Sequence, residues 1–403
     1  MSTEPEEVEV PGVEERPRLL SVEIGDWPGL GGNVGFTLGE RRTVLVGRNG
    51  AGKSLLIEGV NSAVRAAAGA SISLAPHFFH CEIARPNAPA LAYEYRTVGE
   101  DPDAEPSLVE AILRRRRASW SERCWTPEDG AELWRVGDGV FALRGEEPRA
   151  FMPGEGLLGA AYSLPSLELP EGANQLADVF AGFYSLSAGV PRAGWGRREV
   201  LVRSKGRNAQ GNRRWIPEAG RRDETLAWAI THMWDQDREH YNEFVEILRG
   251  LGLLRDVEVK VYEDPQPDPR SRERHDYASV LFDGVNVGLC SDGTQRVADI
   301  VRLLILEHLT CLIIEEPETA VHPGLLARLL AVIDSYSYGR QIVISTHSPE
   351  VVDWCAPKDL RIVERIEGKT QVHALGDEDL ARVHRYLADE GTFSDFVYRW
   401  SEA

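Results

Sequence analysis

The chain has few cysteines, and they follow no pattern. Its 403 residues contain five, an odd number, widely spaced and without a Cys-x-x-Cys pair. They are Cys81, Cys124, Cys290, Cys311 and Cys355. A disulfide framework and a zinc site of the usual spacing are therefore not expected, and we expect a protein of a reducing compartment, the cytoplasm.

Long apolar runs and an excess of positive charge are also missing. The densest apolar stretch, LLILEHLTCLII, is broken by Glu307 and His308, so no membrane span is predicted. The first ten residues, MSTEPEEVEV, are acidic and do not resemble a signal peptide. With 45 basic against 64 acidic residues, the net charge of -19 disfavours indiscriminate binding to DNA or anionic membranes. Any site for a polyanion must therefore be local.

The order of apolar segments predicts an α/β fold with a mostly parallel sheet, because strands alternate with helices. Strands are expected at 19–24, 34–38, 42–47, 277–282, 311–314 and 340–345, and helices at 53–67, 107–117, 223–251 and 323–336. The stretch 190–222 reads as a basic loop. We expect a disordered acidic lead-in at 1–17, core parts at 18–95 and 276–403, and an insertion at 96–275.

The stretch GRNGAGKS, residues 47–54, matches the phosphate-loop pattern GxxxxGK[ST] and lies between an apolar strand and a helix, as that loop requires. Its glycines let backbone N–H groups surround the phosphates of a nucleotide. The residues assigned to that contact are Gly47, Asn49, Gly50, Ala51 and Gly52. Lys53 is expected to reach the β- and γ-phosphates, and the Ser54 hydroxyl to bind Mg²⁺.

Two carboxylates end the apolar strand in CLIIEEPETAVHP. Glu315 is expected to hold Mg²⁺ through its water shell, and Glu316, on the other face, to activate the attacking water as a general base. Paired acids at a strand end are often only a solvated rim. The phosphate loop in the same chain favours the functional interpretation.

Two further polar groups follow the same logic. In RQIVISTHSPEVVD an apolar strand ends just before His347, which is therefore aimed at the crevice that holds the nucleotide, where it can sense the γ-phosphate. In CSDGTQRVADIVRLLI, Ser291 caps a helix with one apolar face. That cap is either only structural or one half of a nucleotide site.

Together these motifs resemble those of ABC-type ATPases, in the soluble RecF/SMC-like and OLD-like branch that carries SDGT-R in place of LSGGQ. The resemblance implies ATP and Mg²⁺ as cofactors and a P-loop core in which an antiparallel β subdomain and a large mixed helical insertion join the parallel sheet. It also implies a head-to-tail dimer, or a higher even oligomer. In such a dimer Ser291 and Gly293 of one subunit close over the nucleotide held by the other subunit's phosphate loop.

The chain departs from the family pattern at three places. Glu315 stands where the family often has Asp. Gln175 is the only guess we make for the family's Q-loop glutamine. Trp27 is the residue expected to stack on adenine, and a core role for it is the alternative.

Stand-alone members of this branch resemble the ATPase subunits of two-gene phage-defence systems such as Septu and PARIS. We therefore expect a switch that controls a separate effector, a nuclease or toxin. Since 56 residues follow His347, no TOPRIM nuclease domain is expected within this chain. A nucleotide-binding transporter subunit is disfavoured by the long insertion, and a scaffold that binds ATP without turnover stays open.

The main alternative is a RecF-like repair ATPase that clamps duplex DNA. It depends on the segment from Arg192 to Arg222, which has ten basic residues against two glutamates and, together with Arg114 to Arg117, could form a DNA groove. The ten are Arg192, Arg197, Arg198, Arg203, Lys205, Arg207, Arg213, Arg214, Arg221 and Arg222. A solvated loop that balances acids elsewhere explains the same charges equally well.

Overall fold

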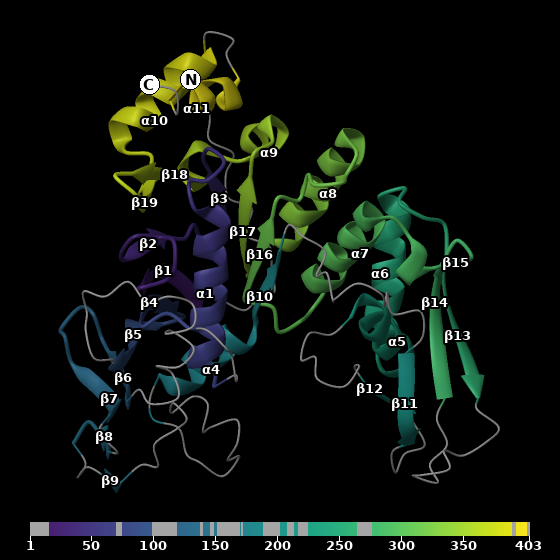
Figure 1. Cartoon of the computed structure of the whole chain (residues 1–403), viewed down its shortest axis with the longest axis horizontal. Coiled ribbons are helices and arrows are strands. Elements are labelled where there is room, and N and C mark those ends of the chain that lie inside the picture. The colour runs from purple at the N-terminus through teal and green to yellow at the C-terminus, as the bar shows by residue number, and fades with distance from the viewer. Residues whose placement is uncertain are drawn as a thin grey trace. The chain divides into compact units, whose positions relative to one another are not determined.

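The structure is a computed structural model that describes residues 16–69, 75–98, 119–137, 140–145, 149–150, 170, 172–187, 202–207, 213–216, 225–263, 276–388 and 392–400. The chain divides into two units, each assembled from stretches far apart in sequence (Figure 1). The first comprises residues 1–185, 308–313 and 337–403, and the second comprises residues 186–307 and 314–336. The sequence analysis likewise expected a core built from two separate parts, 18–95 and 276–403, with an insertion at 96–275 between them, and those bounds stay a prediction.

A six-stranded sheet in the order β10-β16-β17-β3-β18-β19 carries the phosphate loop. Its strands are β3 (Arg42–Val46), β10 (Phe183–Leu186), β16 (Cys311–Glu315), β17 (Gln341–Thr346), β18 (Leu360–Ile366) and β19 (Lys369–Ala374). Strands β17 and β18 both run parallel to β3, and β19 closes the edge as an antiparallel hairpin with β18. Every residue of β16 and β17 is buried, as in a sheet covered on both faces. The predicted mostly parallel sheet is confirmed.

An eight-stranded antiparallel sheet in the order β2-β1-β4-β5-β6-β7-β8-β9 lies in the same unit. Its strands are β1 (Arg18–Gly25), β2 (Val34–Thr37), β4 (Phe78–Arg85), β5 (Ala88–Val98), β6 (Ser119–Trp125), β7 (Glu132–Gly137), β8 (Val140–Leu143) and β9 (Arg149–Ala150). Alternate residues bury large aromatic side chains, among them Phe79, Tyr93 and Trp134, in the core that also includes α1 (Lys53–Ala67). This sheet is the expected antiparallel subdomain.

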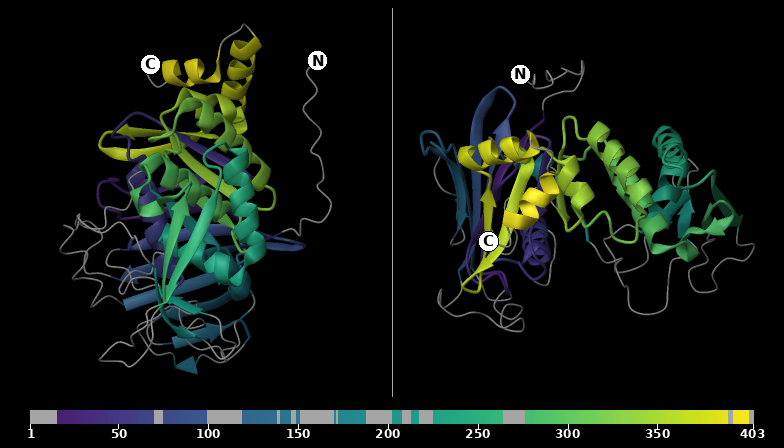
Figure 2. Two further views of the ribbon diagram at one scale, coloured as in Figure 1. Left: turned by 90° about the vertical axis from the view of Figure 1, so that its right-hand side faces the viewer. Right: turned by 90° about the horizontal axis from the view of Figure 1, so that it is seen from above.

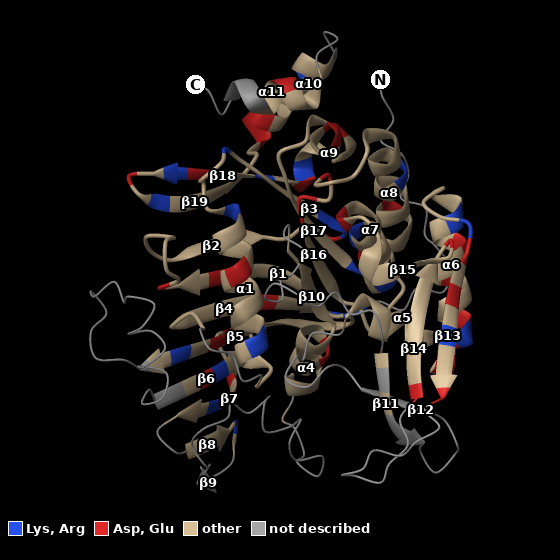
Figure 3. Ribbon diagram, turned by 45° about the vertical axis from the view of Figure 1, so that its right-hand side comes forward, with Lys and Arg blue, Asp and Glu red and all other residues tan. Residues whose placement is uncertain are grey.

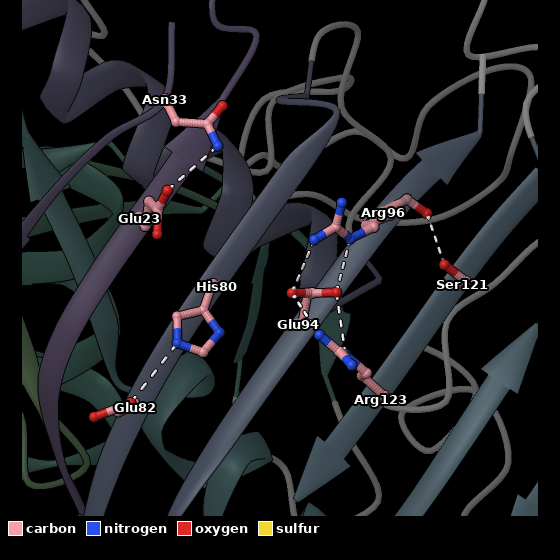
Figure 4. A network of polar contacts seen from close by, with 8 residues as sticks. All are labelled: Glu23, Asn33, His80, Glu82, Glu94, Arg96, Ser121 and Arg123. Atoms are coloured by element: carbon pink, nitrogen blue, oxygen red, sulfur yellow. Dashed lines mark hydrogen bonds and ion pairs between the residues drawn. The ribbon is translucent and has the colours of Figure 1, made fainter. Parts of the chain in front are cut away.

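The other face of this sheet is polar, and Figure 4 shows its central network. The Glu94 carboxylate accepts hydrogen bonds from Nε of Arg96 at 2.8 Å and from Nε of Arg123 at 3.1 Å. Burial alone would raise the pKa of Glu94, but the bonds from the two guanidinium groups outweigh it and lower the pKa. One carboxylate thereby joins β5 to β6 on their outer side.

The described residues of the first unit also contain further helices. Besides α1 they are α4 (Ala173–Ala181), α9 (Pro349–Trp354), the 3₁₀ turn η2 (Pro357–Asp359), α10 (Asp377–Ala388) and α11 (Phe393–Trp400). Helix α1 was predicted with its observed ends, and α9 begins at Pro349 as expected. Helices α10 and α11, yellow in Figure 2, were not among the predicted helices, the last of which was expected at 323–336.

The second unit combines four helices with an antiparallel sheet in the order β12-β11-β14-β13. The helices are α5 (Leu226–Gln236), α6 (Arg238–Gly250), α7 (Asp292–Leu304) and α8 (Pro323–Tyr336). The strands are β11 (Val202–Arg207), β12 (Arg213–Ile216), β13 (Val257–Glu263) and β14 (Asp276–Phe282), with β15 (Val285–Asn286) and the 3₁₀ turn η1 (Val287–Leu289) after β14.

Two sequence predictions for this unit need correction. The helix expected over 223–251 is two helices, because Asp237 adopts a non-helical φ of -141° and its carboxylate accepts from His240 N at 3.2 Å, starting α6. Part of the expected basic loop is a pair of antiparallel strands, β11 and β12. The arginine-rich helix predicted at 107–117 and residues 1–15 lie outside the described residues.

Among the described residues, no helix has the length and apolar character needed to cross a membrane. The same residues contain no cluster of three or more His, Cys, Asp or Glu side chains arranged to hold a metal ion. The hairpin of β18 and β19 carries both basic and acidic residues, as Figure 3 shows.

Candidate functional site

The phosphate loop connects β3 to α1 and depends on glycine at three positions. Gly50 and Gly52 adopt left-handed φ angles of 80° and 103°, which side chains disfavour. Gly47 is needed for a different reason, because a Cβ there would lie 2.0 Å from the Val363 carbonyl oxygen. The loop is tightened by a hydrogen bond from Ala51 N to Arg48 O at 3.2 Å. Asn49, Gly50 and Ser54 remain exposed, so the loop is open toward a ligand.

Lys53 connects this loop to the next strand of the sheet. It is 5% exposed, and its Nζ donates to Gly47 O at 2.7 Å and lies 2.9 Å from His347 Nε2. An ammonium group only donates, so Nε2 of His347 must be the acceptor. The two residues meet because β17 runs parallel to β3, with Thr346 opposite Val46. The structure therefore brings together the lysine and the histidine singled out from the sequence.

Thr370 of β19 also supports the loop, and no sequence motif indicates this role. Its hydroxyl donates to Ala51 O at 3.0 Å, and a Cβ on Gly52 would lie 2.4 Å from the same Oγ1. A threonine on an edge strand is common, so only the tertiary structure reveals this contact.

The adenine and Q-loop assignments do not fit the structure. Trp27 is 4% exposed in the core, against Gly59 of α1, so its ring is not available to stack on a base, and the alternative core role holds. Gln175 lies inside helix α4, not in a loop after a strand. Both were assigned by sequence position alone, and position does not show which way a side chain faces.

In the second unit, the acidic strand end has a special backbone. Glu315 is the last residue of β16 and is buried, whereas Glu316 follows with a left-handed φ of 46°. The strand alternation used to place the two carboxylates on opposite faces therefore does not extend to Glu316. Thr319 Oγ1 donates to Glu316 Oε2 at 3.2 Å. A non-glycine residue in this strained region often marks a functional position.

Arg296 ties the SDGTQR stretch to this strand end, a role that the sequence analysis missed. It is 6% exposed and donates to the Glu315 carbonyl oxygen and to Ser187 O, the latter at 2.8 Å. Burial lowers the pKa of Arg296, while the nearby carboxylates of Glu315, Glu318 and Glu316 oppose that shift. The first turn of α7 and the acidic strand end are thus one connected structure.

Ser291 and Gly293 at the start of α7 have distinct surroundings. Ser291 is the N-cap, and its Oγ accepts from Thr294 N at 3.2 Å. The side chain is exposed. Gly293 is buried, and a Cβ there would lie 2.0 Å from the carbonyl oxygen of Ala320, itself at a φ of 61°. The close approach that glycine permits is therefore to the chain's own backbone.

Gly293→Ala should lower the free energy of unfolding of the second unit by about 1–3 kcal/mol, because the added methyl group overlaps a backbone oxygen that cannot rotate away. Hydrogen exchange of α7 and thermal unfolding measure the effect. Gly250→Ala is the matched control, since no atom lies within 4 Å of a Cβ built at the end of α6. Equal stability of Gly293→Ala and the wild type would show that the backbone at Ala320 can shift to make room for the methyl group at little cost.

Comparisons with known proteins give one family match. No curated protein matches the chain. Searches of solved structures find SMC head domains, one in complex with the C-winged helix domain of ScpA (12% identity, 91% of this chain and 99% of the other, TM-score 0.42). A second is the head domain from Thermotoga maritima, with 13% identity over 89% of this chain and 99% of the other and a TM-score of 0.38. A third, from Pyrococcus furiosus, has 10% identity over 92% of this chain and 100% of the other and a TM-score of 0.41. Because these TM-scores are all below 0.5, no functional role is drawn from these structures.

The family match covers part of the chain. Residues 208–353 match the family described as "AAA domain, putative AbiEii toxin, Type IV TA system". The matched range contains the SDGTQR stretch, the acidic strand end and His347, whereas the phosphate loop lies outside it. Between residues 208 and 353, the chain is thus similar to the ATPase domains that this AAA family describes.

Proposed function

We propose that the protein is an ATP-binding and ATP-hydrolysing switch. The observation that carries this proposal is the contact between Lys53 and His347, 2.9 Å apart, at the mouth of a phosphate loop with left-handed glycines. In a nucleotide complex Lys53 would turn from the loop carbonyls to the β- and γ-phosphates. His347 would then lose its donor and could instead donate a ring N–H to a γ-phosphate oxygen or accept from the attacking water. The histidine thereby reports whether the terminal phosphate is present.

The remaining roles follow from the chemistry of the side chains. The Ser54 hydroxyl and the Glu315 carboxylate are oxygen donors of the kind Mg²⁺ prefers, and they would hold the ion that neutralises the phosphates. Glu316 would act as the general base toward water, since its carboxylate is partly exposed and oriented by Thr319. Adenine recognition is assigned to no residue.

We further propose that two copies pair head to tail, so that α7 of one copy closes the nucleotide site of the other. Two features support this. The Ser291 hydroxyl is exposed at a helix N-terminus, where backbone N–H groups favour an anion. Leu289, two residues earlier, is 63% exposed, more than any other large apolar side chain among the described residues, and a second copy placed over α7 would cover it.

Mixing two inactive variants tests the composite site. Lys53→Ala removes the phosphate contact, and Ser291→Asp keeps a good N-cap but places a negative charge near the γ-phosphate. Each variant alone should lack ATPase activity. Their mixture should recover roughly a quarter of the wild-type rate, because half of random dimers are mixed and each mixed dimer has one intact site.

Ser291→Asn is the control, since it preserves the cap without the charge and should retain most of the activity. No recovery on mixing, together with normal ATP binding by Ser291→Asp, would show that the sites are not shared between copies. An inactive wild-type chain that binds ATP would instead favour a scaffold without turnover.

For the biological output we propose control of a separate effector protein, a nuclease or toxin, in defence against phage, in the cytoplasm. The alternative, a clamp on duplex DNA, has one supporting observation: Arg203, Lys205 and Arg207 on β11 and Arg213 and Arg214 on β12 concentrate five basic residues on one pair of strands. Purifying Glu316→Gln with ATP and Mg²⁺, with and without nuclease treatment, separates the two. A retained protein supports an effector, and retained nucleic acid supports the clamp.

A further inference from the structure

The helix that follows His347 is too short to be stable without contacts to the rest of the protein. Helix α9 has six residues, from Pro349 to Trp354, and isolated helices of this length are not stable in water. Its start is fixed by Pro349 and by a hydrogen bond from Ser348 N to Thr346 Oγ1 at 2.8 Å. The orientation of His347 therefore depends on what anchors the rest of α9.

The end of α9 is anchored to the C-terminal helix α11 by a single carboxylate. Asp353 accepts from the backbone N of Ser394 at 2.7 Å and from its hydroxyl at 3.0 Å. Ser394 is only 4% exposed, and it is the second residue of α11. Its N–H has no partner within a helix at that position, and a negative charge there is favourable. Asp353 thus caps α11 from another helix.

Apolar contacts reinforce the same junction. Val351 and Val352 of α9 are fully buried, and so nearly are Phe393 and Val397 of α11. Helix α11 packs on α9 and also contacts α10, where the rings of Tyr386 and Phe396 lie 5.7 Å apart. A displacement of α11 is therefore transmitted to α9.

We propose that Asp353 is a positioning residue for His347, and that α11 is the element that holds Asp353 in place. This rests on the proposed function. The path has three steps: α11 holds Asp353, Asp353 fixes the end of α9, and the start of α9 sets His347, which faces Lys53. Phosphate binding itself uses the loop at 47–54 and does not pass through α9.

The predicted signature is a change in turnover without a change in affinity. Asp353→Ala should lower kcat about 10-fold, because a small misplacement of a group that contacts the reacting phosphate is costly, while the Kd for ATP stays within about 2-fold. Asp353→Asn keeps an acceptor oxygen and should be intermediate. The effect on kcat of Asp353→Ala and Ser394→Ala combined should be less than the product of the two, since both remove one contact.

The matched control is Asp395→Ala. Asp395 is in the same first turn of α11 and exposed, and its own backbone N bonds to Thr392, so it contributes charge to α11 without contacting α9. It should leave kcat unchanged. Arg42 of β3 lies over the Trp354 ring at 5.0 Å and continues to hold α9 when Asp353 is replaced.

If Asp353→Ala nevertheless failed to fold, Ser394→Ala carries the test; it removes the hydroxyl bonds to Asp353 and to Thr392 Oγ1 but keeps the bond from the Ser394 backbone N to Asp353, and we expect a decrease in kcat of about 3-fold. His347→Ala separates the two proposals. A reduced kcat in His347→Ala with a wild-type kcat in both Asp353→Ala and Ser394→Ala would overturn the positioning role alone. A wild-type kcat in His347→Ala would overturn the assigned role of His347, and the positioning role with it.

Discussion

Lys53→Ala should weaken ATP binding by about 100-fold or more, because a charge-assisted contact to the phosphates is removed from a mostly desolvated position. The ammonium group lies among Gly47 O, Arg48 O and His347. Its charge thus lies at the loop, and to contact the phosphates the side chain has to exchange these acceptors for phosphate oxygens. Titration calorimetry with ATP and with AMP measures the effect.

Comparing ATP with AMP shows which phosphates account for the loss of affinity in Lys53→Ala. AMP lacks the β- and γ-phosphates, so its affinity should change little in the variant. Lys369→Ala, an exposed lysine at the start of β19, is the control for a general loss of positive charge and should bind ATP like the wild type. Equal weakening of ATP and AMP would mean that Lys53 supports the fold of the loop and does not contact the terminal phosphates.

Glu316→Gln should lower kcat for ATP hydrolysis by roughly 10²–10³-fold while preserving ATP binding. The amide keeps the size of the side chain and an oxygen that can accept from Thr319, so the strained backbone at φ 46° has the same support. What the variant loses is basicity toward the attacking water. Single-turnover assays and size measurement in the presence of ATP and Mg²⁺ follow the two consequences, slow hydrolysis and an accumulated closed dimer.

Glu315→Gln provides the contrast. If Glu315 holds Mg²⁺, that variant should require more Mg²⁺ to reach its maximal rate, whereas Glu316→Gln should stay slow at every Mg²⁺ concentration. Hydrolysis by Glu316→Gln at the wild-type rate would mean that another group activates the water. The two carboxylates are adjacent in sequence but differ in burial, so a difference in behaviour is expected from the structure.

The sequence predicted the parallel sheet and the phosphate loop well because both depend on local patterns. A fully apolar strand such as β17 can only be buried on both faces, and a GxxxxGK[ST] run after β3 has one common conformation. It also predicted that His347 would approach the loop, since parallel strands present their carboxyl ends at one edge.

What the sequence could not predict depends on tertiary contacts. The sequence does not show whether the Trp27 side chain faces solvent or packs against α1, because the packing of the whole core determines its direction. The steric need for glycine at Gly293 comes from Ala320, and Thr370 reaches the loop from the far end of the chain. In the sequence, Asp237 looks like one polar residue within a long helix. In the structure its non-helical backbone ends α5, and its side chain caps the start of α6. Each of these effects joins residues that local periodicity treats separately.

The order of strands in the central sheet also sets the order of events during synthesis. Strand β3 is made early, but its neighbour β17 pairs Ile342 with Arg42, and β18 comes later still. A ribosome must therefore add about 300 residues before the strand that precedes the phosphate loop gains either partner, which makes folding slow and non-local. Nascent chains should gain ATP affinity only after β17 and β18 have been made, so a product truncated before β17 would not compete for nucleotide.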